Sequence, residues 1–406
     1  MIRRYQLDNG LRIVEESLPS LRSVSIGIWI LTGSRNESYA YNGISHLIEH
    51  MLFKGTQTRN ARDIAEAFDS IGGDTNAFTS KEYTCLYAKV MDQHTNYALD
   101  LMFDMIFNST FDEDELEREK NVIYEEIAMT EDTPDDIIHD HLHEVSFKYH
   151  PLGKPILGNH DTLEGITRDD ILKFREEYYT SDRIVISIAG NIPEGLYEKI
   201  NELFSDLPSN SSSNDELMTS YNIEVMKQHK ETTQAHLCLG YEGIPIHHDS
   251  IYHMAVLNNV LGGSMSSRLF QKIREELGLT YTIFSYHNAF RDNGILTVYG
   301  ATNLEQLDLL EQEIQLTVED IWKHGITEKE LNNTIQQLKG QIVLGLENPN
   351  SRMHRNGRNE LLGIEHIPLN SLIQQFEQVT HRGIEELAQK TFSQKPSKAC
   401  ILPQDV

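Results

Sequence analysis

Two histidines and a glutamate at fixed spacing are the residues of this chain best suited to chemistry. They are His46, Glu49 and His50, in the run His-Leu-Ile-Glu-His. Asn42 and Gly43 precede them as helix-start residues, so we expect a helix here. Residues four apart share one face of a helix, which lets both imidazoles reach one metal ion. Zinc favours such nitrogens and keeps one position for water in catalytic sites. Glu49 would stand beside that water without being a ligand.

The residues around this motif predict that the helix is buried. Ionisable side chains on a buried helix must be paired or bound to a metal, because leaving them unpaired is costly. A solvated helix that has this spacing by chance is the alternative, and the apolar neighbours argue against it. The order HxxEH is that of the inverted zinc-peptidase motif. The apolar neighbours are Ile44, Leu47, Ile48, Met51 and Leu52.

A second helix supplies candidates for a third zinc ligand. It begins near Asp112 and contains Glu119, Glu125 and Glu126. Glu119 and Glu126 lie two turns apart on one face, whereas Glu125 points about 100° away. Glu126 would complete a site of two histidines and one glutamate that holds one Zn2+ per chain. Glu119 would then orient one of the ligands.

The motif and its continuation resemble a known peptidase family. Residues 46–56, HLIEHMLFKGT, are similar to the motif of the pitrilysin, insulysin and mitochondrial processing peptidase family. In that family a glutamate 76 residues past the second histidine ligates zinc, which is the position of Glu126. Its companion acid corresponds to Glu119. The resemblance spans the whole chain and is closest to the short, two-domain bacterial members. It implies a zinc metalloendopeptidase in which Glu49 is the general base.

Two further segments match the same family and imply its substrate contacts. Residues 72–80 resemble the strand at the edge of the active site, to which substrate adds as a β-strand. Without the resemblance, an ordinary hairpin strand is the simpler interpretation. Residues 267–281 resemble the segment that binds the region of the scissile carbonyl. The implied substrate-binding residues are Asn76, Ala77, Phe78, Arg274 and Tyr281.

The helices and strands that are expected to position these residues have counterparts in the second half of the chain. The helix near Asp112 aligns with one that begins at Thr327, and this sets Leu116 on Leu331. Each half reads as strands and amphipathic helices without strict alternation, which predicts an α+β fold. We expect two similar sandwich halves, each a mixed or antiparallel sheet packed with helices, joined by a linker like a clam. Two strand pairs also correspond: residues 23–30 with 233–241, and residues 183–189 with 398–402.

A polar, turn-rich stretch at residues 207–215 has the composition of a linker. It predicts a zinc-binding catalytic domain at residues 1–212 and a duplicated domain at residues 213–406. On the same alignment, Thr334 and Gln341 stand where the first half has Glu119 and Glu126, and no second HxxEH occurs. The second domain is therefore predicted to be free of metal and to contribute substrate-binding residues.

The composition of the chain limits which cellular compartment and which classes of binding partner are expected. The 406 residues have a formal net charge of −27, which disfavours nucleic acid. No run of apolar residues is long enough for a membrane span, and the first residues do not read as an export signal. The three cysteines are far apart and suit a reducing compartment, where each serves as a small buried hydrophobe. These features predict a cytoplasmic protein.

The excess of acid has two interpretations. It serves solubility, or it lines a cavity that attracts basic peptides. By resemblance, the two halves enclose a chamber for short peptides or extended termini, and two chains form a homodimer. The alternative function is a catalytically silent scaffold, or a subunit that needs a different partner chain. Manganese or cobalt in place of zinc stays open.

A second group of histidines invites a metal interpretation that we do not adopt. His139, His141 and His143 alternate beside Asp135, Asp136 and Asp140. Because this setting is polar, we expect a solvated helix face there.

Overall fold

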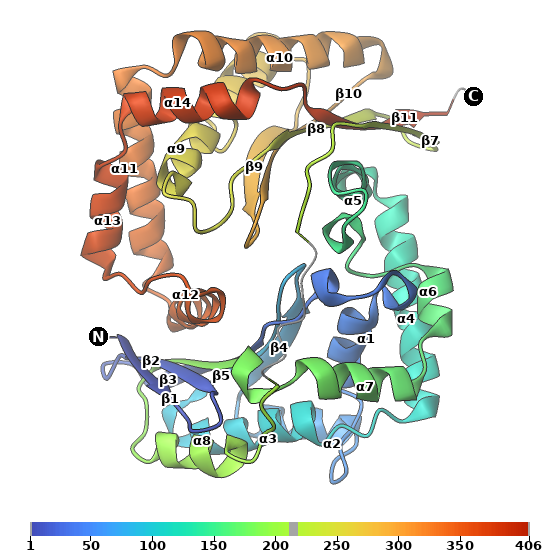
Figure 1. Cartoon of the computed structure of the whole chain (residues 1–406), viewed down its shortest axis with the longest axis vertical. Helices are drawn as coiled ribbons and strands as arrows, with labels where there is room; N and C mark the ends of the chain where they lie inside the picture. Colours follow the sequence, from blue (N-terminus) through green and yellow to red (C-terminus); the bar gives the residue numbers. More distant parts are fainter. Residues whose placement is uncertain (1, 211–217, 405–406) are drawn as a thin grey trace. The chain divides into compact units, whose positions relative to one another are not determined.

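The computed structural model describes residues 2–210 and 218–404, which form two compact units (Figure 1). Each unit has one mixed sheet and its own set of helices. The predicted boundary between residues 212 and 213 lies outside the described residues. Within the described residues, none of the helices has the length and hydropathy to cross a membrane.

The first unit is built on a six-stranded sheet of order β1-β2-β6-β3-β5-β4. β2 and β6 are parallel and the other neighbours are antiparallel, so β4 lies at one edge. Strands β1 and β2 form an antiparallel hairpin whose connection contains Asn9 and Gly10. The strands are β1 (Ile2–Gln6), β2 (Arg12–Ser17), β3 (Ser23–Ile30), β4 (Asp74–Thr79), β5 (Thr84–Met91) and β6 (Ile184–Gly190). The helices are α1 (Ile44–Met51), α2 (Ala61–Ser70), α3 (Thr95–Phe107), α4 (Glu113–Asp132), α6 (His160–Gly165), α7 (Arg168–Tyr178) and α8 (Leu196–Phe204).

The second unit is built on a five-stranded sheet of order β7-β11-β8-β10-β9. Here β7 and β11 are the parallel pair. The strands are β7 (Val225–Lys230), β8 (Ala235–Glu242), β9 (Ile283–Ala289), β10 (Gly294–Thr302) and β11 (Ser397–Pro403). The helices are α9 (Ile251–Leu261), a π-helical segment (Phe270–Glu276), α10 (Leu307–His324), α11 (Glu328–Gly345), α13 (Leu369–Glu377) and α14 (His381–Phe392).

The two sheets share one topology, which confirms the predicted similarity of the halves. Without β1, the order β2-β6-β3-β5-β4 matches β7-β11-β8-β10-β9 strand for strand, and the parallel pair is the same in both. The strands aligned from the sequence, β3 with β8 and β6 with β11, occupy equivalent places. The aligned helices are α4 and α11. All three cysteines are free and buried in these sheets, as predicted.

Each unit contains one segment from the other half of the chain. Ala128–Lys154 belongs to the second unit, and its helix α5 (Pro134–Ser146) packs on β8 and β11. Leu344–Pro368 belongs to the first unit, and its helix α12 (Pro349–Leu362) packs on β2, β3 and β6 (Figure 1). The domains predicted as continuous stretches thus each receive a helix from beyond the linker.

Polar contacts hold α12 on the first sheet. Arg4 makes a two-pronged ion pair with Glu360, with N–O distances of 2.6 and 2.8 Å. Burial raises the pKa of Glu360, but hydrogen bonds from His366 and Arg4 outweigh it and lower that pKa to about 2. Ser187 donates to the main-chain carbonyl of Met353 at 2.7 Å. Specific polar contacts therefore hold α12 on the first sheet in addition to apolar packing.

The solvated face expected for His139, His141 and His143 is wrong. Their helix is α5, which covers the second sheet, and His143 is only 5% exposed. His139 shares a hydrogen bond of 2.7 Å with the Tyr286 hydroxyl, and its burial lowers its pKa. His141 lies 2.6 Å from the side-chain oxygen of Gln228, and the ring of His143 packs against Phe147 and Phe290. Only the passage of α5 onto the other sheet buries them.

The close packing of α12 against the first sheet can be tested by substituting Gly357, with a glycine of another helix as the matched control. A Cβ on Gly357 would lie 2.2 Å from Nε1 of the buried Trp29, whereas a Cβ on Gly340 of α11 meets nothing within 4 Å. Gly357→Ala should lower the free energy of unfolding by about 1–3 kcal/mol through overpacking. Gly340→Ala should raise it by about 0.5–1 kcal/mol through helix propensity. Urea unfolding followed by circular dichroism measures both, and a stabilising Gly357→Ala would contradict this packing.

Candidate metal centre

A buried carboxylate fixes the start of α1. Glu37 is 4% exposed and accepts hydrogen bonds from the main-chain N–H groups of Gly43 at 2.8 Å and Ser45 at 2.9 Å. Burial raises the pKa of Glu37, and these hydrogen bonds oppose that rise. Gly43 has φ of 100°, and a Cβ there would lie 2.8 Å from the carbonyl oxygen of Leu157. The carboxylate satisfies N–H groups that a helix start leaves free and places the following turns.

The apolar residues of α1 lie on one face of the helix, and its ionisable residues lie on the other. Ile44, Leu47 and Ile48 are at most 1% exposed and belong to the core of the first unit. His46 and His50, together with Glu49, are partly accessible on the remaining face. The helix is thus rigidly packed on one side and presents its ionisable groups on the other.

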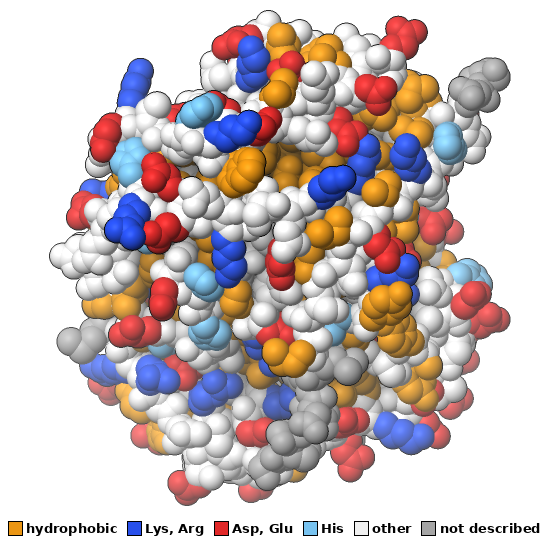
Figure 2. Space-filling model, turned by 45° about the horizontal axis from the view of Figure 1, so that its top comes forward, with side chains coloured by type: hydrophobic (Ala, Val, Ile, Leu, Met, Phe, Trp, Pro, Cys, Tyr) orange, Lys and Arg blue, Asp and Glu red, His pale blue; other side chains and the backbone are white. Residues whose placement is uncertain are grey.

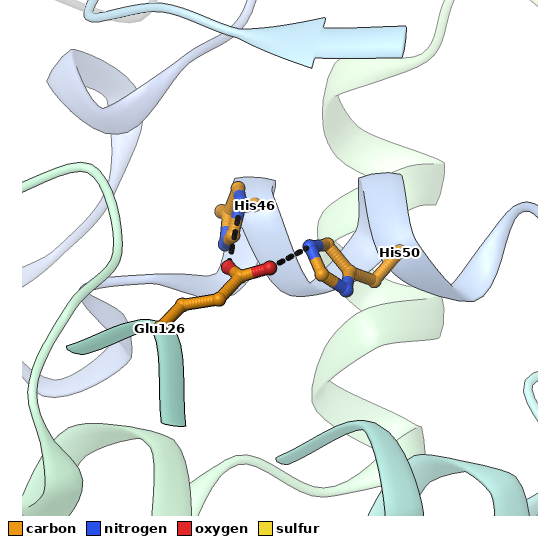
Figure 3. A group of neighbouring side chains, drawn as sticks. All are labelled: His46, His50 and Glu126. Carbon is orange, nitrogen blue, oxygen red and sulfur yellow. Dashed lines mark ion pairs between the residues drawn. The ribbon is translucent and has the colours of Figure 1, made fainter. Parts of the chain in front are cut away.

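His46, His50 and Glu126 form a compact group of possible metal ligands. Figure 3 shows the carboxylate of Glu126, from α4, reaching both imidazoles of α1. Glu126 oxygens lie 3.8 Å from Nε2 of His46 and 3.7 Å from Nε2 of His50. Among the described residues it is the one group found of this kind, and its ligand atoms all lie within 4.8 Å of one another. Ligands of tetrahedral zinc are about 3.4 Å apart, so a small contraction would fit the ion.

The protonation of His46 suits a metal ligand. Burial, and secondarily the neighbouring His50, lowers the pKa of His46 to about 4. The ring is therefore neutral near pH 7, which is the form that binds a metal. Its Nδ1 is buried and has no hydrogen-bond partner among the described residues. With the proton on Nδ1, Nε2 has its lone pair free toward Glu126 and His50.

A buried ion pair stands behind His50. Glu119, 4% exposed, places one carboxylate oxygen 3.1 Å from Nδ1 of His50. Its other oxygen lies 2.6 Å from the ammonium group of Lys54. Glu119 can thus accept the Nδ1 proton of His50, which fixes the ring and leaves Nε2 free for a metal. Lys54 offsets the cost of burying the Glu119 charge.

Glu49 is held apart from these groups by a strand residue. The Thr79 hydroxyl, at the end of β4, donates to Oε2 of Glu49 at 2.6 Å. Burial raises the pKa of Glu49, and the Thr79 hydrogen bond is the largest influence that lowers it. Glu49 does not belong to the group of possible metal ligands. It is placed beside the group, where a base would act on bound water.

The expected substrate residues of the first half lie on the edge strand β4. Asn76 is exposed, and its side-chain oxygen accepts the main-chain N–H of Ala77 at 2.8 Å. The Phe78 ring packs against Trp29 and His354, with ring centroids 5.7 Å away in each case. Strand β4 therefore offers its main chain at the edge, while the Phe78 side chain is engaged within the first unit.

The expected substrate residues of the second half lie in the second unit. The guanidinium of Arg274 stacks 4.3 Å from the centroid of the Tyr281 ring and 4.6 Å from that of Phe270. Tyr281 is 77% exposed. The two residues thus form one cation–π pair, in which the tyrosine is exposed and the arginine is partly buried. Thr334 and Gln341 of α11 stand in place of the acids of α4, and no metal-ligand group was found in the described part of this unit.

Comparison with known proteins identifies the family. Residues 12–160 match the model of the insulinase family, peptidase family M16, and residues 165–338 match that of the peptidase M16 inactive domain. The chain belongs to the M16 family of peptidases. The description of the second domain as inactive agrees with its lack of the site residues.

Relatives of known sequence and structure extend over the whole chain. A Bacillus subtilis protein described as an uncharacterized zinc protease is 50% identical over 403 residues, 99% of this chain and 98% of its own. A Streptomyces coelicolor protein of the same description is 37% identical, covering 99% and 90%. The crystal structure of a protease from Helicobacter pylori matches with a TM-score of 0.92 at 22% identity, covering 99% of each chain. At that identity the match establishes that the two chains share a fold.

Three residues that position the site were not singled out from the sequence. Lys54 and Thr79 lie within segments that match the family, but nothing in their spacing marks a role. Glu37 lies seven residues before the first residue of α1, with a loop between them. Known capping patterns place the capping side chain next to the helix start, so they do not point to Glu37. Each acts through a contact between elements.

The Lys54 ion pair should affect metal affinity. Lys54→Met leaves the Glu119 carboxylate buried without its cation, so the orientation of His50 weakens and zinc affinity should fall about 10- to 100-fold. Lys54→Arg should recover most of it. Competition with a chelating dye measures the dissociation constant, with the exposed Lys89→Met as a control that keeps full affinity. Unchanged affinity in Lys54→Met would show that the ion pair does not support the site.

Proposed function

We propose that this chain is a zinc-dependent endopeptidase whose metal is held by His46, His50 and Glu126. The observation that carries the proposal is the convergence of these three side chains, with Glu49 beside them and outside the ligand group. Membership of the M16 family and the zinc-protease description of the relatives support the same reaction. The catalytic residues would lie in the N-terminal half.

The side chains divide the work of peptide hydrolysis. A bound zinc ion would acidify a water molecule and polarise the peptide carbonyl. Oε2 of Glu49 is occupied by Thr79, so Oε1 is the oxygen that accepts the water proton. Glu49 then gives this proton to the leaving amine nitrogen. Glu119 keeps the His50 ring in place throughout.

The second domain would stabilise the reacting carbonyl. By resemblance, Arg274 and Tyr281 donate hydrogen bonds to the carbonyl oxygen as its negative charge develops. Their cation–π contact holds both side chains in one group, which supports a joint role. Substrates would be short peptides or extended termini that pair with β4 at Asn76, Ala77 and Phe78 and are enclosed in a chamber. Cleavage of a folded protein as fast as of its unfolded form would contradict the chamber.

The net charge of −27 supports a preference for peptides that carry lysine or arginine. On the face drawn in Figure 2, acidic and basic side chains are interspersed, so an acidic lining would have to lie elsewhere. Matched basic and acidic peptides test this preference, and faster cleavage of the acidic peptide would refute it.

A homodimer in the cytoplasm completes the proposal. The alternative is a scaffold or partner-dependent subunit, against which the complete set of site residues argues. Sedimentation of the purified chain would show a dimer, and a monomer that cleaves peptides would rule out the need for one.

The direct test replaces the base without removing a ligand. Glu49→Gln keeps the shape of the side chain but cannot accept a proton. It should retain about one zinc per chain and lose peptide cleavage by a factor of about 10²–10⁴. Elemental analysis and a fluorogenic basic peptide measure the two quantities. Zinc without cleavage in either protein would favour the partner-dependent alternative, and no zinc in either would exclude the assigned ligands.

A further inference from the structure

We propose that Thr79 is a positioning residue that couples pairing of a peptide with β4 to the placement of Glu49. The inference rests on the proposed function and extends it, because it concerns how substrate binding prepares the base. It follows from the two directions in which Thr79 makes contacts: its side chain toward α1, and its main chain toward the free edge of the sheet.

The side-chain contact has a defined donor. An ionised carboxylate can only accept hydrogen bonds, so the Thr79 hydroxyl must donate to Glu49. The distance of 2.6 Å lies in the range of about 2.5–2.7 Å for such charge-assisted bonds. The neighbouring Thr84 hydroxyl, 3.5 Å away, donates its own proton to the carbonyl of Thr32 at 3.0 Å. The proton of Thr79 is therefore left for Glu49.

The main chain of Thr79 points to the open side of β4. The N–H of Ser80 donates to the carbonyl of Tyr83 at 2.8 Å, which closes the hairpin between β4 and β5. In an antiparallel pair, residues alternate between bonding this partner and facing away from it. Thr79 and Ala77 are thus the residues that face away. The N–H of Ala77 agrees, because it is satisfied by the side chain of Asn76.

Strand β4 has a neighbour on one side only among the described strands of its sheet. A peptide that adds to it would bond the main chain of Thr79, and that of Ala77 once the peptide displaces the Asn76 side chain, and so hold β4 from both sides. Because the Thr79 hydroxyl is hydrogen-bonded to Oε2 of Glu49, fixing the position of β4 also fixes the position of this carboxylate oxygen. Pairing along β4 would fix the base in the orientation that leaves Oε1 free for the water proton.

This coupling gives substrate residues far from the cleaved bond an effect on turnover. Binding energy from remote parts of a substrate raises kcat when it orders groups that act in the transition state. In the unmodified chain, lengthening a peptide along β4 should therefore raise kcat as well as lower KM. Without the Thr79 hydroxyl, added length should still lower KM but should no longer raise kcat.

The experiment measures kcat and KM for one cleavage sequence in peptides of increasing length. Thr79→Val should lower kcat for the longest peptide about 10- to 100-fold and remove its dependence on length, with zinc per chain unchanged. Thr79→Ser should restore both, and Thr79→Ala repeats the loss if valine disturbs the strand. Thr75→Val is the matched control, because the Thr75 hydroxyl on the same strand donates to the Tyr87 carbonyl at 3.1 Å and not to Glu49.

The outcomes separate this inference from the proposed function. An unmodified chain that binds zinc and cleaves no peptide would overturn both. Cleavage by the unmodified chain, with kcat rising with length equally in Thr79→Val, would overturn the coupling alone. So would a loss of kcat by the same factor at every length, because Thr79 would then support the base without any response to the substrate strand.

Discussion

The structure of the site depends on one constraint: a helix buried on one face carries three ionisable side chains on the other. Each of them needs a partner, since unpaired charge near the core is costly. His50 has Glu119, which in turn has Lys54, and Glu49 has Thr79. His46 and His50 share Glu126 across a distance that a metal ion would bridge. The partners come from α4 and β4, so the constraint also determines which elements must pack against α1.

The two units show how one topology can hold or lack such a site. Their sheets match strand for strand, and the long helices α4 and α11 correspond. Where α4 presents Glu119 and Glu126, α11 presents Thr334 and Gln341. The exchanged helices α5 and α12 give each sheet a cover from the other half of the chain. The fold of the second unit therefore persists without counterparts of Glu119 and Glu126, because a hydrophobic core of its own packs around the second sheet.

The sequence predicts much of this arrangement because the relevant signals are local. The helix at His46 follows from the helix-start residues Asn42 and Gly43, and the similarity of the halves follows from matching helix starts. Contacts between elements are less accessible. Nothing near Glu37, Lys54 or Thr79 reveals the groups that they meet, and the polar residues around His139 and His143 do not reveal that the first is partly buried and the second fully buried. That error has a physical cause: α5 ends at Ser146 and is covered by a sheet whose first strand, β7, begins only at Val225.

The central claim is that His46, His50 and Glu126 bind one zinc ion, and locating the ion tests it most directly. Crystals grown with zinc would be measured above and below its absorption edge. The account predicts one anomalous peak per chain, about 2.0–2.2 Å from Nε2 of each histidine and from a carboxylate oxygen of Glu126. A strong peak elsewhere, with these three side chains in place and empty, would contradict it.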